Sequence, residues 1–272
     1  MSTRLPSKNH SAIVTPGVGL VIALRREASA LFGRVRWMDC GNGQSWGTTP
    51  HRDKTVTVVR SGPGIRNAQR AGRWLVSSHA AIIGSVGVSG GLSPRLGKGD
   101  LVLADEIILW NGETYERAWK SDASSVIPLF VALQANRVPV KHGRILTTKR
   151  PALTLREKAV HFRETGALAV DMESAGVAEE AKKAGIPFFA LRAVCDPADM
   201  TIPHFISDCL DSNGNIRSTY LCGQLLKNPF EVVALLGLQR CFTLAVRHLK
   251  VAWEGRPLQQ VLLRVMTPSD RS

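Results

Sequence analysis

The chain has 272 residues, of which 44% are hydrophobic and 6% aromatic, so it is long enough for one large α/β domain or two small ones. Its formal net charge of +13 favours anionic partners such as phosphates, nucleic acid or an anionic membrane surface. An arginine-rich composition without any such partner explains the charge equally well.

Cysteine and histidine spacing excludes several kinds of site. The seven histidines form no H-x-x-x-H pair, so no metal centre is expected. The cysteines are odd in number and form no C-x-x-C pair, which argues for a reducing compartment and against a disulfide framework or zinc site. No long apolar run precedes residue 18, so residues 1–16 are expected to form a flexible polar tail without a signal peptide. We therefore expect a cytoplasmic protein.

Buried strands and helices alternate through the first half of the chain. Apolar or β-branched runs predict strands at 18–24, 55–59, 80–86 and 101–109. Apolar residues at helical spacing predict helices at 25–32, 67–76 and 126–134. This alternation is typical of an α/β fold with a mostly parallel or mixed sheet.

The alternation continues in the second half. Strands are predicted at 144–148, 167–170 and 187–194, and helices at 153–162 and 172–184. We expect a single α/β domain over residues 17–204, with a central mixed β-sheet flanked by helices. Residues 205–272 are expected to form a C-terminal helical extension.

The extension contains one long predicted helix at 229–254. Polar residues recur on it mostly every three or four positions, and nearly all its other residues are apolar. The polar positions interrupt the apolar run too often for a membrane span, which needs about 20 apolar residues. The helix therefore docks on the core, or lies as a basic amphipathic helix on a membrane surface.

Three carboxylates follow predicted strands: Glu27, Glu173 and Asp196. In an open α/β sheet the carboxyl ends of the strands form one edge, so Glu173 and Asp196 are expected to face one crevice. Each also has an ordinary structural explanation: a solvated helix carboxylate, a helix-dipole contact and a turn before proline. The functional alternative makes Glu173 a ligand for a sugar diol and Asp196 a general acid.

A glycine-rich segment, residues 87–92, closes the strand predicted at 80–86. Glycines there allow backbone N–H groups to approach a ligand closely. A tight turn explains the same residues, so the segment alone is weak evidence for a binding site.

Five blocks of the sequence, in order, resemble the purine nucleoside phosphorylase and nucleosidase superfamily over residues 18–200. The blocks are VGLVIALRREA (18–28), SGPGIRNA (61–68), GVSGGLSPRLGKGDLVLADE (87–106), VDMESAGVAEEAKKAGIPF (170–188) and LRAVCDPAD (191–199). Within this superfamily the chain is most similar to the adenosylhomocysteine nucleosidases and the hopanoid-associated phosphorylases.

The resemblance implies a role for each matched residue. Asp196 would protonate the departing purine, and Glu173 would hold the ribose 2′ and 3′ hydroxyls with Met172 packed on the sugar. Glu27 would activate the attacking water. Ser89 and Gly90 would line the base and sugar, and Leu24 is placed with them as substrate-binding. Cys195, beside the acid, replaces the family's usual serine and is also expected at the substrate.

The sequence departs from the phosphorylase pattern in its phosphate site. The family's G-D-P-x-R stretch is absent, although Arg26 falls near the position of the phosphate-binding arginine. Ser85 and Val88 replace two further phosphate-contacting residues. Water and phosphate thus both remain possible acceptors, with phosphate as a co-substrate in the second case and no other cofactor expected.

We therefore expect an enzyme that cleaves the N-glycosidic bond of an adenine ribonucleoside. By resemblance the substrate is adenosylhopane, giving ribosyl- or phosphoribosylhopane, which would place the enzyme at the inner face of the membrane as a homodimer or larger homo-oligomer. One alternative is a soluble nucleosidase for methylthioadenosine, adenosylhomocysteine or futalosine. The other is a non-catalytic nucleotide- or nucleic-acid-binding protein. A nucleic-acid partner is not expected, because no aromatic residues interleave the basic ones.

Overall fold

The computed structural model describes residues 17–51, 54–121, 123–135, 139–203 and 231–255. The expected tail at 1–16 and, within the expected extension, residues 205–230 and 256–272 lie outside the described residues.

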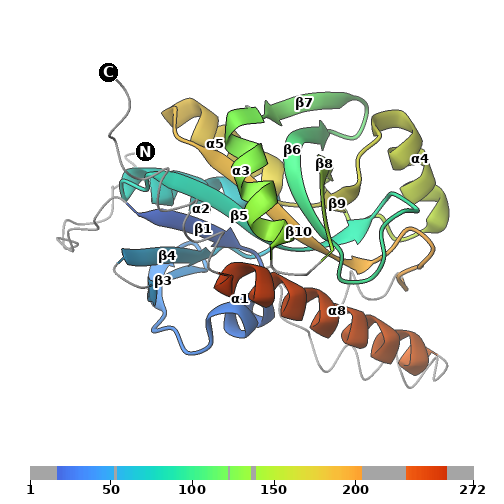
Figure 1. Ribbon diagram of the computed structural model, residues 1–272, viewed down its shortest axis with the longest axis horizontal. Coiled ribbons are helices and arrows are strands. Elements are labelled where there is room, and N and C mark those ends of the chain that lie inside the picture. Colours follow the sequence, from blue (N-terminus) through green and yellow to red (C-terminus); the bar gives the residue numbers. More distant parts are fainter. Residues whose placement is uncertain (1–16, 52–53, 122, 136–138, 204–230, 256–272) are drawn as a thin grey trace, which may run out of the picture.

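A ten-stranded mixed sheet forms the centre of the described part of the chain (Figure 1). Its strands are β1 (Val18–Ile22), β2 (Met38–Gly41), β3 (Gln44–His51), β4 (Lys54–Arg60), β5 (Ile82–Gly91), β6 (Leu101–Trp110), β7 (Tyr115–Lys120), β8 (Val140–Thr147), β9 (Ala169–Asp171) and β10 (Phe188–Asp196). β5 is parallel to β1 and β10, whereas β10 and β6 are antiparallel. The expected mixed sheet is confirmed.

Half of this sheet closes on itself. β5 pairs with β10, β10 with β6, β6 with β8, β8 with β9, and β9 again with β5. β5 pairs with β1 as far as Ser85 but with β9 only at Gly90 and Gly91. β1 and β9 therefore pair with different parts of β5 and diverge from each other.

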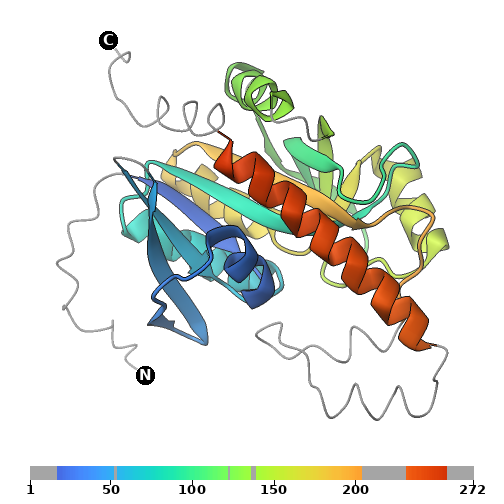
Figure 2. The same cartoon turned by 60° about the horizontal axis from the view of Figure 1, so that its bottom comes forward.

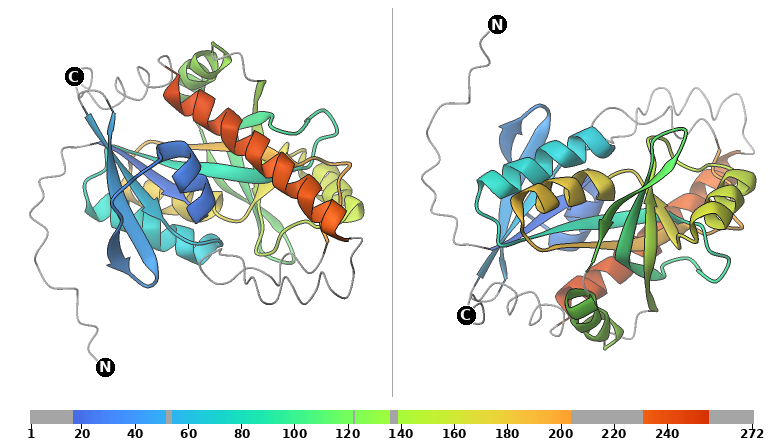
Figure 3. Two further views of the ribbon diagram at one scale, coloured as in Figure 1. Left: turned by 90° about the horizontal axis from the view of Figure 1, so that it is seen from below. Right: turned by 90° about the horizontal axis from the view of Figure 1, so that it is seen from above.

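The helices are α1 (Arg25–Phe32), α2 (Ile65–Ser77), α3 (Ala123–Gln134), α4 (Leu155–Thr165), α5 (Ser174–Ala184) and α8 (Glu231–Glu254). α1 and α8 cover one face of the sheet (Figure 2), and α2 and α5 lie side by side on the other (Figure 3). Strand alternation explains the two layers: Leu20 and Ile22 of β1 pack in the cluster of α1 and α8, whereas Val21 packs in that of α2 and α5.

Helix α8 docks on the core, which is one of the two interpretations of this segment. It packs against β10 and α1, and Trp253 meets Phe32 edge-on with ring centroids 5.7 Å apart. Its inward face also buries Cys241, Ala245, Val246, Leu249 and Ala252. Arg240, Arg247 and Lys250 remain on the exposed face. No helix among the described residues is long and apolar enough to cross a membrane.

Three strands are absent from the expectations: β2, β3 and β7. None has the continuous apolar run that predicts a buried strand. β2 and β7 lie at edges of the sheet, whereas β3 pairs with both β2 and β4 but is polar in sequence. Each of the two hairpins contains an Asn-Gly turn sequence, which a search for apolar runs does not detect. Asn42-Gly43 joins β2 to β3 with φ of 57° and 74°, and Asn111-Gly112 lies between β6 and β7. Asn-Gly between two extended segments is a strong hairpin signal.

Candidate active site

A cavity of about 180 Å³ lies at the gap between the diverging strands. Its walls come from the ends of β1, β5, β9 and β10, from the first turn of α1 and from the start of α5. It is lined by Ala23, Leu24, Glu27, Pro63, Val88, Ser89, Gly90, Thr148, Pro151, Ala152, Val170, Asp171, Met172, Glu173, Asp196 and Ile202. Seven residues expected at the substrate are among them: Leu24, Glu27, Ser89, Gly90, Met172, Glu173 and Asp196.

Glu27 lies in the first turn of α1 and is almost fully buried, with 2% of its surface exposed. Its Oε1 accepts a hydrogen bond from the Val88 backbone N–H at 2.7 Å, and its Oε2 accepts one from the Leu24 N–H at 2.9 Å. Burial raises the pKa of Glu27 from 4.5 to about 7, although both N–H groups and Arg192 oppose the shift. Glu27 can therefore exchange a proton near neutral pH.

Glu173 is the residue that precedes α5 and faces the same cavity. Its Oε1 accepts a hydrogen bond from the Gly64 N–H at 3.0 Å, and its Oε2 lies 3.7 Å from the Arg192 guanidinium. Burial raises the pKa of Glu173, and Asp171 raises it further, while Arg192 opposes them. Met172 beside it is half-buried and supplies an apolar wall.

Asp196 is the last residue of β10 and is also buried. Its Oδ2 accepts a hydrogen bond from the Lys158 ammonium at 2.7 Å. Burial raises the pKa of Asp196 from 3.8 to about 6, although Lys158 opposes the shift. The carboxyl group is thus protonated in a substantial fraction of molecules at slightly acid pH, as a general acid requires.

A buried arginine lies behind Glu27 and Glu173. Arg192 of β10 is 1% exposed and donates to Asp171 Oδ2 from Nε at 2.7 Å and to the Ser85 hydroxyl from Nη2 at 2.7 Å. Ser174 also accepts from Arg192, at 3.1 Å. Sequence reasoning did not select Arg192 or Asp171 as site residues. The available signal was a charged residue in the middle of a strand otherwise buried on both faces.

The charges in the site favour a cation. Glu27, Asp171 and Glu173 all lie near the single guanidinium of Arg192, so this part of the site has three carboxyl groups for one cation. A buried surplus of negative charge stabilises a proton or a positive reaction centre. The Ser89 hydroxyl, buried at the cavity, has no hydrogen-bond partner among the described residues and can bind a ligand.

Two residues expected at the substrate lie elsewhere. Arg26 is exposed on α1, and its guanidinium lies over the Phe242 ring of α8, 5.1 Å from the centroid. Cys195 points into the core cluster beneath α8 rather than into the cavity. Successive side chains of a strand face opposite ways, which explains why Asp196 faces the cavity and Cys195 does not.

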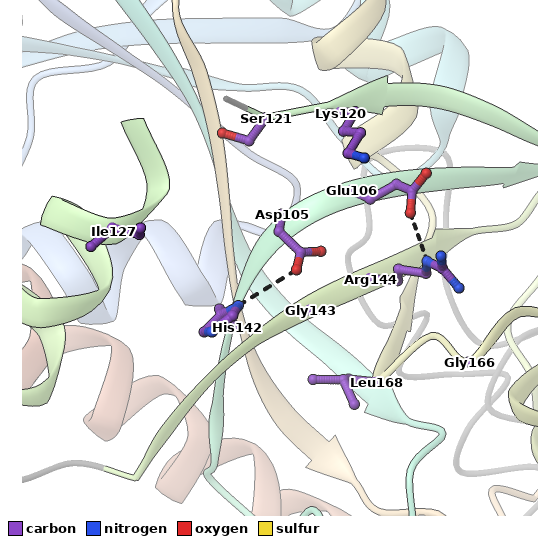
Figure 4. A pocket seen from close by; sticks show the side chains of 10 residues that line it. All are labelled: Asp105, Glu106, Lys120, Ser121, Ile127, His142, Gly143, Arg144, Gly166 and Leu168. Carbon is purple, nitrogen blue, oxygen red and sulfur yellow. Dashed lines mark hydrogen bonds and ion pairs between the residues drawn. The ribbon is translucent and has the colours of Figure 1, made fainter. Parts of the chain in front are cut away.

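A wider cavity of about 560 Å³ lies away from these carboxylates, between β6, β7 and β8 (Figure 4). Its two carboxylates, Asp105 and Glu106, both have basic partners. The buried Glu106 accepts from Arg144 at 2.6 Å and also from Arg117, and His142 lies 3.5 Å from Asp105. With Lys120 also in the lining, the carboxylates do not outnumber the cations in this cavity.

Comparison with known proteins gives the family. The family model described as the phosphorylase superfamily matches residues 47–213, so the chain belongs to that superfamily. A 5′-methylthioadenosine/S-adenosylhomocysteine nucleosidase from Marinomonas sp. (strain MWYL1) is 27% identical over 192 residues, which cover 64% of this chain and 81% of the relative.

Solved structures share the fold. The 5′-methylthioadenosine/S-adenosylhomocysteine nucleosidase of Neisseria meningitidis, in complex with methylthio-immucillin-A, has a TM-score of 0.65 at 21% identity, covering 88% of this chain and 97% of that one. The futalosine hydrolase of Helicobacter pylori strain 26695 has a TM-score of 0.64 at 18% identity, with the same coverage.

Proposed function

We propose that the protein cleaves the N-glycosidic bond of adenine ribonucleosides with water as the acceptor. The observation that carries this proposal is the meeting of Glu27, Glu173 and Asp196 around one cavity, with Glu27 and Asp196 both titrating near neutral pH. The related Marinomonas protein is named as a nucleosidase of adenine nucleosides, which supports the same chemistry.

Each carboxylate takes one part of the reaction. Asp196 gives its proton to the purine as the bond from C1′ to N9 breaks, and the bonding electron pair leaves with the base. Glu173 accepts hydrogen bonds from the 2′ and 3′ hydroxyls of the sugar, which becomes an oxocarbenium-like cation. Glu27, when ionised, takes a proton from the water whose oxygen bonds to C1′. The products are free adenine and a sugar with a hydroxyl at C1′.

Water is favoured over phosphate as the acceptor, because the side chains that could bind phosphate already bond other groups of the protein. Arg192 donates hydrogen bonds to Ser85 and to Asp171 inside the protein. Arg26 stacks on Phe242, away from the cavity. A phosphate dianion in the cavity would meet Glu27 and Glu173, and like charges in a buried site repel strongly.

We further propose an apolar 5′ substituent, with adenosylhopane as the particular substrate. Apolar side chains support this part of the proposal: Leu24, Met172 and Ile202 line the cavity together with Pro151 and Ala152. A small alkylthio group would suit the same walls, so methylthioadenosine and adenosylhomocysteine are the main competitors.

A lipid-linked substrate requires contact with a membrane. Arg240, Arg247 and Lys250 on the exposed face of α8 could supply about 1 kcal/mol each at an anionic surface before screening. We therefore propose a cytoplasmic protein that binds the membrane peripherally. Replacing all three with glutamine should reduce sedimentation with anionic vesicles and leave cleavage of soluble nucleosides unchanged. A homodimer or larger homo-oligomer stays a prediction, to be tested by light scattering.

A panel of purine ribonucleosides with different 5′ groups tests the proposal. Adenosine, methylthioadenosine, adenosylhomocysteine, futalosine and adenosylhopane in mixed micelles are incubated with and without phosphate, and the products are separated by liquid chromatography. We expect release of base that does not depend on phosphate, fastest for apolar 5′ groups. Release from futalosine alone would contradict the apolar substituent, and no release from any of them would contradict the activity.

A further inference from the structure

One lysine in the described part of the chain is fully buried, and it contacts the proposed acid. Lys158 of α4 has 0% of its surface exposed. A lysine is almost never fully buried unless its charge is paired, because removing an ammonium from water costs several kcal/mol. Its presence beneath the cavity therefore needs an explanation beyond packing.

The Lys158 ammonium binds both the side chain and the chain segment of the acid. Its Nζ lies 2.7 Å from Asp196 Oδ2 and 3.1 Å from the Asp196 carbonyl oxygen. It also lies 2.9 Å from the carbonyl oxygen of Pro197 and 2.8 Å from that of Met200. The Lys158 ammonium thus donates hydrogen bonds to three backbone carbonyls at the turn after β10 and to one oxygen of the Asp196 carboxyl group.

The position of Lys158 is itself fixed. α4 begins with a capping box, in which the Thr154 hydroxyl accepts from the Glu157 N–H at 3.1 Å and Glu157 accepts from the Thr154 N–H at 2.9 Å. The Ile202 N–H donates to the Leu153 carbonyl at 2.9 Å, which ties the segment after the turn to the residue before α4. The ammonium therefore acts on Asp196 from a rigid element.

We propose that Lys158 is a positioning residue for the reaction: it binds Asp196 Oδ2, directs the other oxygen to the base, and stabilises the carboxylate that forms when the proton leaves. This inference rests on the proposed function for the role of Asp196. The proton moves from Asp196 to the purine, and Lys158 keeps its own protons throughout.

The charge of Lys158 should control the pH at which the acid works. The titratable groups near Asp196 are Lys158 on α4, Cys195 on β10, and Glu27 and Glu173 across the cavity. Of these, Lys158 is the one that lowers the pKa of Asp196. An adjacent opposite charge typically lowers a carboxyl pKa by about 1–3 units, so a neutral residue at 158 should raise the pKa of Asp196 by that amount.

The first measurement is the pH profile of kcat/KM for wild type, Lys158→Gln and Lys158→Arg. Its maximum lies midway between the pKa values of acid and base, so Lys158→Gln should move it upward by about 0.5–1.5 pH units. Lys158→Arg keeps the cation and should keep the maximum within about 0.3 unit while lowering kcat. A merely structural lysine would change the rate or stability without moving the maximum.

A second measurement does not depend on activity. The folded-state pKa of Asp196 is raised from 3.8 to about 6, so its contribution to stability is present when it is protonated and is lost as the pH rises through that range. We compare Tm between wild type and Asp196→Asn from pH 4 to 9, and repeat this with Lys158→Gln in both proteins. The Tm difference should stop changing near pH 6 with Lys158 present, and about 1–3 units higher without it.

The outcomes separate the two proposals. If wild type cleaves no nucleoside, the proposed function fails, and the Tm comparison still tests the coupling of Lys158 to Asp196. The inference is overturned if folded Lys158→Gln keeps both the wild-type maximum and the wild-type Tm dependence. If Lys158→Gln does not fold, Lys158→Arg decides: an unchanged pH maximum with lower kcat supports the inference, and a displaced maximum overturns it.

Discussion

Glu27 and Asp196 have pKa values in the reverse of the order that their roles would suggest. The proposed base, Glu27, titrates near 7 and the proposed acid, Asp196, near 6. Hydrolysis needs the base ionised and the acid protonated together, a state that only about a tenth of the molecules or fewer occupy at any pH. We expect a bell-shaped profile of kcat/KM with its maximum between these two values. Initial rates across the pH range check this, and a rate that rises steadily above neutral pH would contradict it.

Asp196→Asn removes the transferable proton and preserves the size of the side chain. We expect kcat to fall by about two to four orders of magnitude, the usual contribution of a general acid. Asp199→Asn is the matched control, because Asp199 is exposed three residues further along. Single-turnover release of adenine measures both variants. A folded Asp196→Asn protein with wild-type turnover would remove this carboxyl from the mechanism.

Glu173→Gln tests recognition of the sugar diol. A carboxylate accepts hydrogen bonds from two hydroxyls, whereas an amide offers one acceptor and a misplaced donor. We expect a larger loss of kcat/KM on ribonucleosides than on their 2′-deoxy analogues. Glu179→Gln, in the helix that Glu173 precedes, serves as the control, since the Glu179 carboxylate pairs with Lys183 outside the cavity. Equal losses on both kinds of substrate would argue against the diol contact.

At the scale of residues, the sequence identified the site residues that stand at the ends of predicted strands. Glu27, Glu173 and Asp196 each end or follow a strand, so a rule about strand ends places them together. Lys158 and Arg192 could not be found this way. Lys158 sits in a helix of alternating polar character and meets Asp196, 38 residues away, only after α4 packs beside β10. Burial of a charge is a tertiary property that its own segment does not reveal.

At the scale of elements, the buried strands and the helices are read from apolar runs, and their predicted bounds differ from the observed ones by a few residues. The closure of β5, β10, β6, β8 and β9 into a ring is not readable in the same way, because it depends on which strands pair. Pairing is decided by contacts between distant segments, for which hydrophobic periodicity carries no information.

Helix α8 gives the prediction that belongs to this scale. Leu249 is fully buried against the core, whereas the neighbouring Lys250 is exposed. Leu249→Ala should lower the free energy of unfolding by about 2–5 kcal/mol, because it removes buried surface and leaves a cavity. Lys250→Ala should change it by less than about 0.5 kcal/mol. Urea denaturation of both variants measures this, and a negligible effect of Leu249→Ala would mean that α8 is not part of the core.

At the scale of the whole molecule, the cavity between β1 and β9 is lined by buried carboxylates. α2 and α5 pack on one face of the sheet, and α1 and α8 pack on the other. The site lies between these two layers, at the ends of the strands. The net charge of +13 is a sum over the whole chain, so it bears on partners rather than on the reaction.

The acceptor of the sugar tests the central claim most directly. Purified protein is incubated with methylthioadenosine in H₂¹⁸O, with phosphate either absent or in large excess, and the sugar product is analysed by mass spectrometry. The three-carboxylate mechanism predicts free adenine and a sugar that carries one ¹⁸O at C1′, in the same yield under both conditions. A sugar 1-phosphate formed only when phosphate is present, or adenine release that persists in Glu27→Gln, would contradict it.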